Sequence, residues 1–176
     1  DALDGKPCGG FGDGGKVLLF GEEGLVAGDV SNSSAPVVAA GVVVTGSTVI
    51  DFVRATTPRG TVQAFDSFSG QPLWQFDPLL GHAGSGSANV WAPISVDEKN
   101  GLVFLPTSSA SPDYYGVDRP GDNPYANSVV ALALHSGAYR WHFQHVRHDL
   151  WDYDTPAQPI LFDWRKDGAN IPALAQ

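Results

Sequence analysis

One internal repeat constrains the fold of this chain more than any other feature. Residues 64–76 match residues 131–143, which lie 67 positions further along. Each copy reads as a strand, a glycine-containing turn and a second strand, so a fixed period of this length indicates a repeated unit of supersecondary structure. The residues that coincide are Ala64 and Ala131, Ser69 and Ser136, Gly70 and Gly137, Trp74 and Trp141, and Phe76 and Phe143.

A repeat of this length holds one four-stranded sheet with its loops, which is the size of a propeller blade with a long insertion. Residues 2–7 read as a shortened third copy if Gly5 is equivalent to Gly70. Because a blade buries its faces only against neighbouring blades, two to three blades predict part of a ring. A β-sandwich is the alternative, since a count of strands does not separate the two architectures.

The rest of the chain also predicts an all-β fold. Gly (21) and Pro (13) interrupt nearly every segment that could form a helix. Between these interruptions lie short apolar runs rich in β-branched residues, which are typical of strands. The clearest runs are residues 37–38, 42–44, 61–65, 102–105 and 128–132.

Charge and hydropathy exclude several classes of protein. Ten Lys and Arg against 19 Asp and Glu give a net charge of −9, which argues against nucleic acid as a partner. Hydrophobic residues make up 43% of the chain and charged residues 16%, which permits a buried core. No apolar run reaches the ~18 residues of a membrane span. The absence of methionine, including at position 1, predicts that processing or truncation produced the first residue.

The densest cluster of reactive side chains is HVRHDLWDYD at residues 145–154. One of its aspartates is a candidate general base beside an aromatic wall that excludes water. The alternative is a capped loop in which the aspartates accept hydrogen bonds from backbone N–H groups. His145 and His148 have the spacing of two metal ligands, but no third His or Cys lies near them. We expect His148 to orient a neighbour by hydrogen bonding.

Three other segments carry candidate binding residues, each with an ordinary structural alternative. The hydroxyls and carboxylate of residues 46–51 suit a hard cation such as calcium, or a simple turn. Trp91 follows a Gly/Ser-rich loop, where it is either a platform for a planar cofactor or sugar ring or a core aromatic. Residues 106–123 read as one long surface loop, and such loops are frequently functional.

These motifs together resemble the pyrroloquinoline-quinone (PQQ) dependent dehydrogenases. The resemblance rests on HDLWD at residues 148–152, RPGDN at 119–123, NVWAP at 89–93 and the Ala-x-x-x-x-Ser-Gly-x-x-x-Trp repeats. The continuation DYDTPAQP at 152–159 is similar to the membrane-bound glucose dehydrogenase branch. The resemblance covers nearly the whole chain and implies two to three blades of an eight-bladed β-propeller over residues 1–176.

The resemblance also implies site residues. Asp152 matches the catalytic aspartate that takes the substrate's hydroxyl proton, and Trp91 matches the tryptophan that stacks on the quinone. Asn89, Thr48 and Ser33 fall on cofactor-contacting positions. The metal ligands for Ca²⁺ are implied at Asp51 and Ser111, where Ser111 is the nearest match to an asparagine ligand of the methanol dehydrogenase branch. A basic residue that contacts the quinone oxygens is expected a few residues beyond Gln176.

We therefore expect an oxidoreductase, or a piece of one, that oxidises an alcohol or sugar hydroxyl by hydride transfer to PQQ. The family implies a periplasmic location and a quinone or cytochrome as electron acceptor. Because two blade edges are left open, we expect the 176 residues alone to bind PQQ poorly and to show little activity. The alternatives are a non-catalytic propeller scaffold that binds proteins, and a lectin-like or hydrolytic β domain.

Overall fold

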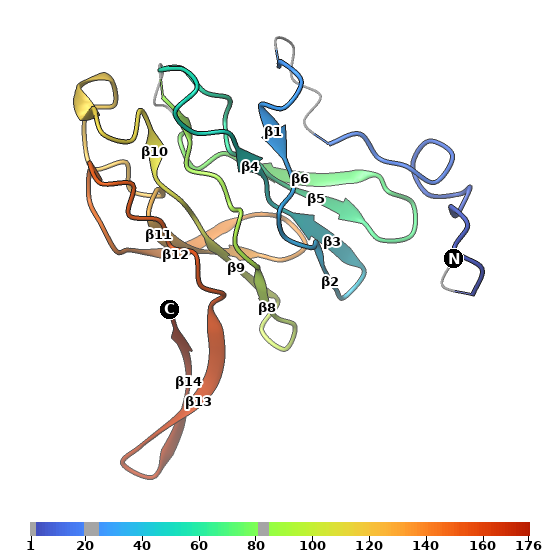
Figure 1. The fold of residues 1–176 in the computed structure, drawn as a ribbon. Helices are drawn as coiled ribbons and strands as arrows, with labels where there is room; N and C mark the ends of the chain where they lie inside the picture. Colours follow the sequence, from blue (N-terminus) through green and yellow to red (C-terminus); the bar gives the residue numbers. More distant parts are fainter. Residues whose placement is uncertain (1–2, 20–24, 81–84) are drawn as a thin grey trace.

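The computed structural model describes residues 3–19, 25–80 and 85–176 of the chain. Within these residues the regular structure consists of fourteen β-strands and one short 3-10 helix, η1 (Gly116–Asp118), so the predicted all-β fold is confirmed. Figure 1 shows that most strands belong to two sheets and that a final hairpin extends away from them. No helix in the described ranges is long and apolar enough to cross a bilayer.

Two antiparallel sheets of four strands form the body of the chain, and both follow the same plan. Each is a meander in which the chain leaves the sheet once, between its second and third strands, and then returns. The strands of the first sheet are β2 (Val37–Ala39), β3 (Val42–Thr45), β5 (Val62–Asp66) and β6 (Pro72–Phe76), and those of the second are β8 (Ser95–Asp97), β9 (Leu102–Pro106), β11 (Ser128–Ala133) and β12 (Tyr139–Gln144).

The sequence repeat corresponds to the last two strands of each sheet. Strands β5 and β6 of the first sheet have the positions that β11 and β12 have in the second. Both pairs contain a register shift at the equivalent point, after Ala64 in the first copy and after Ala131 in the second. The repeat therefore specifies the strands, their pairing and the position of the irregularity.

The main hydrophobic core joins the two sheets. Val44 and Val62 of the first sheet and Leu105, Val130 and Leu132 of the second have no exposed surface and belong to one cluster. Because both sheets contribute the buried faces, neither would keep its apolar residues out of water alone. This mutual burial is the behaviour predicted for neighbouring blades.

Trp74 links the first copy of the repeat to the second. Its indole Nε1 donates a hydrogen bond of 2.8 Å to the carbonyl oxygen of Leu134. The ring lies so close to Gly137 that a Cβ there would come within 2.8 Å of it. Gly137 also has a φ of +66°, so glycine is needed both for the turn and for this contact.

The predicted third copy at residues 2–7 is wrong as a pair of strands. Residue 2 lies outside the described residues, and residues 3–7 form a turn followed by irregular chain. Gly5 has a φ of +70°, close to the +72° of Gly70. Residues 2–7 therefore match the repeat only in a turn glycine with positive φ, and such a turn does not require strands on either side.

The chain ends in a hairpin that the sequence interpretation did not predict. Strands β13 (Ile160–Lys166) and β14 (Ala169–Ala175) pair over their whole length. Asp167 and Gly168 connect them, both with positive φ, which matches the tight turn that an Asp-Gly pair favours.

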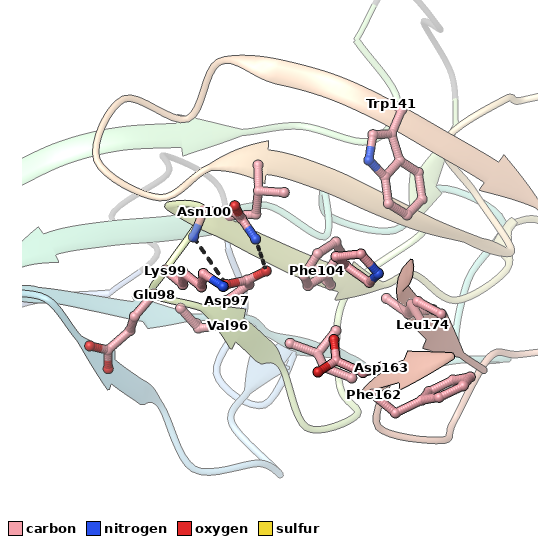
Figure 2. A pocket seen from close by; sticks show the side chains of 14 residues that line it. Val96, Asp97, Glu98, Lys99, Asn100, Phe104, Trp141, Phe162, Asp163 and Leu174 are labelled. Carbon is pink, nitrogen blue, oxygen red and sulfur yellow. Dashed lines mark hydrogen bonds between the residues drawn. The ribbon is translucent and has the colours of Figure 1, made fainter. Parts of the chain in front are cut away.

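A groove of about 590 Å³ separates this hairpin from the second sheet. Figure 2 shows Phe104 and Trp141 on the sheet side of the groove and Leu174 on the hairpin side. Trp141 is the equivalent of Trp74 and is 39% exposed here. None of the residues predicted to act in chemistry lines this groove.

Two short two-stranded sheets lie outside the four-stranded ones. Each contains one strand of an excursion, which is the connection between the second and third strands of a four-stranded sheet: β4 lies on the first excursion and β10 on the second. Strand β1 pairs with β4, and β7 pairs with β10, all antiparallel. Their bounds are β1 (Val30–Ser31), β4 (Thr48–Val49), β7 (Gly86–Ser87) and β10 (Ala110–Ser111).

Candidate active site

Four long connections leave the same end of the two sheets. Neighbouring strands are antiparallel, so the second and fourth strands of each sheet run in the same direction and finish at one end. The chain leaves the sheets there after β3, β6, β9 and β12. The long loops of both sheets therefore meet, whereas the short turns lie at the opposite end. All the predicted site residues after position 47 lie on these connections.

A cavity of about 170 Å³ lies where the four connections meet. Its wall combines carboxyl, hydroxyl and amide groups with one valine side chain and one indole ring. The lining residues are Thr48, Val49, Asp51, Asn89, Trp91, Ser108, Ser109, Asp113, Asp152 and Asp154.

Five of the seven predicted site residues line this one cavity. Asp152 and Trp91 come from the connections that follow the fourth strands, and Asn89 lies two positions before Trp91. Thr48 and Asp51 come from the excursion of the first sheet. Segments more than a hundred positions apart in sequence thus contribute to one wall.

Ser33 is exposed and does not line this cavity. Its hydroxyl is 2.6 Å from the hydroxyl of Thr48 and donates a hydrogen bond of 3.1 Å to the carbonyl oxygen of Trp91. The neighbouring Ser34 hydroxyl donates to the same carbonyl. Ser33 therefore contacts two residues of the wall, and its predicted contact with the cofactor stays a prediction.

Ser111 is not among the residues that line the cavity. It is buried in the short β7–β10 pair, opposite Gly86, and its carbonyl oxygen accepts a hydrogen bond from the Ser85 hydroxyl. Asp113, two positions further along, lines the cavity instead. The role of Ser111 as a metal ligand stays a prediction that no contact with the cavity supports.

Asn89 uses its side-chain amide to hold the wall together. Its Nδ2 donates to the Ser47 carbonyl oxygen at 2.9 Å, and its Oδ1 accepts from the Ser108 hydroxyl at 3.0 Å. Asn89 is 3% exposed, and both the N and the O of its amide are hydrogen-bonded. It therefore links the segment of Ser47, in the first sheet's excursion, to that of Ser108, in the second.

Trp91 is held in place by Asp154. The indole Nε1 donates to Asp154 Oδ2 at 2.8 Å, while Asp154 Oδ1 accepts from the backbone N–H of Ser109 at 2.9 Å. A carboxylate acceptor makes such bonds stronger than a neutral one does. The indole ring and the loop of the second sheet are thus fixed by the same side chain.

The carboxyl groups of the cavity repel one another. Burial raises the pKa of Asp51 to about 6, with further contributions from the charges of Asp152 and Asp154. Burial also raises the pKa of Asp113 to about 6, again with contributions from Asp51 and Asp152. The pKa of Asp152 is raised by burial and then by Asp154 and Asp149. Crowded carboxylates of this kind favour either a bound proton or a cation.

The loop that carries Asp152 has a strained backbone. His148 has a φ of +45° and Asp152 a φ of +58°, both in the left-handed region. This conformation costs roughly 1–2 kcal/mol per non-glycine residue. Strain at a residue that lines a cavity is typical of functional loops, and the surrounding structure must hold it.

Asp149 holds this loop through its side chain. One carboxylate oxygen accepts from the Ser109 hydroxyl at 2.6 Å, the Asn127 amide at 2.9 Å and the Tyr153 N–H at 2.6 Å. The other accepts from the Trp151 N–H at 3.0 Å. Burial alone would raise the pKa of Asp149, but these hydrogen bonds outweigh it and keep the pKa below its ordinary value.

Two aspartates of the acidic cluster differ in their surroundings. Asp149 is the hydrogen-bonded loop aspartate, and Asp152 lines the cavity. His148 orients a neighbour as predicted, because its Nδ1 donates to the Gly121 carbonyl oxygen at 2.7 Å. Among the described residues, no group of three or more His, Cys, Asp or Glu side chains is placed so that it could hold a metal ion.

Sequence reasoning did not assign functions to Asp113 and Asp154. Asp113 lies in the long loop that the sequence marks as functional, and Asp154 in the acidic cluster. A rule that ranks every carboxylate on the long connections would have found both, because those connections end at the same cavity.

Comparisons with known proteins agree with this architecture. The family model described as "PQQ: Glucose/ethanol/alcohol dehydrogenase, beta-propeller domain" matches residues 1–176. The glycerol dehydrogenase large subunit of Gluconobacter oxydans is 39% identical, over 99% of this chain and 25% of that protein. The quinoprotein glucose dehydrogenase of the same organism is 34% identical, over 99% of this chain and 23% of that protein.

A solved structure has the same fold. Quinohemoprotein alcohol dehydrogenase from Comamonas testosteroni superposes with a TM-score of 0.72 and 26% identity, over 86% of this chain and 26% of that one. The chain therefore spans about a quarter of the length of the relatives it matches. The two four-stranded sheets are blades of a propeller, as predicted, and not the halves of a sandwich. Repeat, sheet plan and family match agree, and the chain belongs to the PQQ-dependent glucose, ethanol and alcohol dehydrogenases through their β-propeller domain.

Proposed function

We propose that this chain forms one wall of the active site of a quinoprotein dehydrogenase that oxidises a hydroxyl group of a polyol, sugar or other alcohol. In this proposal Asp152 is the general base, Trp91 supports the planar cofactor, and Asp51 binds a Ca²⁺ ion. The observation that carries the proposal is the convergence of Asp51, Trp91 and Asp152 on one cavity from three distant parts of the sequence.

The residues of the cavity fit the cofactor and cation that the family implies. Trp91 offers a flat ring whose orientation is fixed by its bond to Asp154. Asp51 and Asp113 offer carboxylate oxygens, the ligands that a hard cation prefers, and both have pKa values raised to about 6. A divalent cation would offset the repulsion between them. Because no group of described side chains could hold a metal ion alone, the cation would bind here together with the cofactor.

The chain's residues divide the work of alcohol oxidation. PQQ, held against Trp91 with a cation at Asp51, would supply the acceptor for the hydride of the carbinol carbon, which is chemistry that no side chain supplies. Asp152 accepts the hydroxyl proton as the carbonyl bond forms, so the substrate loses one hydride and one proton. A cation bound at Asp51 would lower the raised pKa of Asp152 and would keep this carboxyl group ionised for the task. Trp91 and the strained loop fix the distance between base and cofactor face.

The scaffold alternative explains the cavity less well. A protein-binding surface has no need of clustered carboxyl groups whose pKa values are raised by loss of solvent and by one another's charges, because such groups reduce stability. Sites of this kind are characteristic of catalysis or ligand binding.

The relatives indicate the class of substrate and partner. Those that match over nearly the whole chain are named for glycerol, glucose and quinate, all of which carry several hydroxyl groups. We propose a polyhydroxy substrate for this protein also, with a membrane quinone or a cytochrome as electron acceptor and the periplasm as its location.

Reconstitution tests the proposed function. A full-length dehydrogenase that carries these 176 residues is prepared without cofactor and then supplied with PQQ and Ca²⁺. We expect the absorbance of bound quinone and turnover of glycerol, glucose or quinate with an artificial electron acceptor. The 176 residues alone should bind PQQ poorly and show little turnover. A full-length protein that binds neither PQQ nor Ca²⁺ would contradict the proposal and favour the scaffold.

A further inference from the structure

The segment RPGDN at residues 119–123 packs against the loop that carries Asp152. The backbone N–H of His148 donates to the Asp122 carbonyl oxygen at 3.2 Å, and the His148 ring donates to the Gly121 carbonyl oxygen at 2.7 Å. This segment belongs to the family pattern, and none of its residues lines the cavity. The structure shows that it contacts the first residue of the strained loop.

Arg119 is the largest side chain in the chain's described part that is fully buried, at 1% exposure. Its Nε donates to the Pro112 carbonyl oxygen at 3.1 Å and its Nη1 to the Asn123 side-chain oxygen at 3.0 Å. Its Nη2 donates to the Asp113 carbonyl oxygen at 3.0 Å and also to the carbonyl oxygen of Asp149. A buried guanidinium is expensive to desolvate, so its donors must be satisfied.

These bonds connect the two sides of the cavity. The carbonyl groups of Pro112 and Asp113 belong to the excursion of the second sheet, whose Asp113 side chain lines the cavity. The carbonyl group of Asp149 belongs to the loop whose Asp152 side chain lines the cavity from another direction. The planar guanidinium of Arg119, whose N–H donors are fixed relative to one another, thus holds the backbone of both segments in position.

The negative partner of this arrangement is Asp149. The guanidinium uses the carbonyl oxygen of Asp149, while the carboxylate of Asp149 accepts the four hydrogen bonds described above. The charges of Asp149 and Asp113 favour the charged form of Arg119, while Arg119 and Asp149 each bind different donors or acceptors. Together they restrain the loop at its first turn, directly before Asp152.

We propose that Arg119 is a positioning residue for the general base, acting through the Asp149 backbone to hold the strained loop in its active conformation. The proposal rests on the assignment of Asp152 as base. Lysine at position 119 would keep the charge but would not reproduce the planar fork, so charge and geometry can be separated. A residue that only contributes to stability would alter the folded fraction without altering the properties of the folded enzyme.

The test compares Arg119→Lys and Arg119→Gln in a full-length dehydrogenase that carries these residues, with Arg140→Gln on the exposed side of β12 as the matched control. In the cofactor-free protein, amide hydrogen exchange of residues 148–154 should accelerate in both Arg119 variants, while exchange in β9 and β11 is unchanged. In the reconstituted enzyme we expect kcat to fall about 100-fold for Arg119→Gln, because a small displacement of a catalytic group lowers the rate by about that factor. The loss should be smaller for Arg119→Lys, which keeps the charge. KM and PQQ affinity should change less than the kcat.

The isotope effect distinguishes positioning from loss of folded protein. A displaced base makes the chemical step slower, so the deuterium isotope effect on kcat with a carbon-deuterated substrate should rise in the Arg119 variants. If they fail to fold, Asn123→Ala removes one of the guanidinium's acceptors and should give a smaller change in the same direction.

Two outcomes overturn different claims. Wild-type exchange at residues 148–154 and wild-type kcat in Arg119→Lys and Arg119→Gln would refute the positioning role of Arg119. Normal turnover in Asp152→Asn would refute the base, whatever Arg119 does. In the Asp152→Asn background, Arg119→Lys should cause little further loss of kcat, since both changes affect one function.

Discussion

The indole Nε1 of Trp91 donates to Oδ2 of Asp154 over 2.8 Å. The two residues are 63 positions apart, one after the last strand of the first sheet and the other after the last strand of the second. Their bond joins the proposed cofactor platform to the loop of the proposed base, so a change in either residue should affect both.

The first prediction concerns this bond. In the full-length enzyme, Asp154→Ala and Trp91→Phe should each weaken PQQ binding by about tenfold, since a hydrogen bond to a charged acceptor is worth roughly 1.5 kcal/mol or more. Because both changes remove the same bond, the double variant should bind PQQ more tightly than the product of the two effects predicts. Titration of the apoenzyme with PQQ measures this. Asp118→Ala, on the exposed end of η1, is the control, and fully additive effects would show that the bond does not orient the platform.

The second prediction concerns the contact between blades. In the 176-residue chain, Trp74→Ala should lower the free energy of unfolding by about 3 kcal/mol, since it removes a packed ring and its bond to Leu134. Trp141→Ala, at the equivalent position, should cost less because Trp141 is 39% exposed. Urea unfolding monitored by circular dichroism compares the two. Equal losses would contradict the idea that Trp74 joins the blades.

The third prediction concerns pH. The pKa of Asp149 is lowered in the folded protein despite burial, so its ionised form stabilises the fold above the unfolded value near 3.8. This contribution should disappear as pH falls through the folded pKa. Asp149→Asn should therefore reduce stability at pH 7 and make it depend less on pH below 4. Urea midpoints measured between pH 7 and pH 3 test this, with the exposed Asp118→Asn as the control for loss of a charge. An unchanged pH dependence in Asp149→Asn would show that another carboxylate dominates acid unfolding.

The blades could be predicted because the sequence encodes them locally and twice. The match between residues 64–76 and 131–143 gives the two strand pairs and the turn glycines. The final hairpin was predictable too, since Asp167 and Gly168 form a favoured two-residue turn between apolar runs. It was overlooked because it has no partner in the repeat.

The site was harder to predict because it depends on distances between loops. Residue type and family pattern indicate Asp51, Trp91 and Asp152, and these three line one cavity. The same pattern placed a metal ligand at Ser111, which lies in the β7–β10 pair, whereas Asp113 lines the cavity. Ser111 and Asp113 are two positions apart in one loop, and only the coordinates show which of them lines the cavity.

The structural roles of Asp149 and Arg119 could not be derived from sequence. Each acts through backbone groups, Arg119 through carbonyl oxygens and Asp149 in part through N–H groups. Every residue has such groups, so they leave no compositional signal. An arginine in a loop is ordinarily exposed, and nothing in the sequence marks Arg119 as buried.

The most direct test of the central claim is the turnover of Asp152→Asn in the reconstituted full-length enzyme. Asparagine keeps the shape of the side chain but cannot accept the proton, so kcat should fall by about 10³-fold while PQQ affinity and the folded fraction stay close to wild type. A variant with normal kcat and normal PQQ binding would show that Asp152 is not the base.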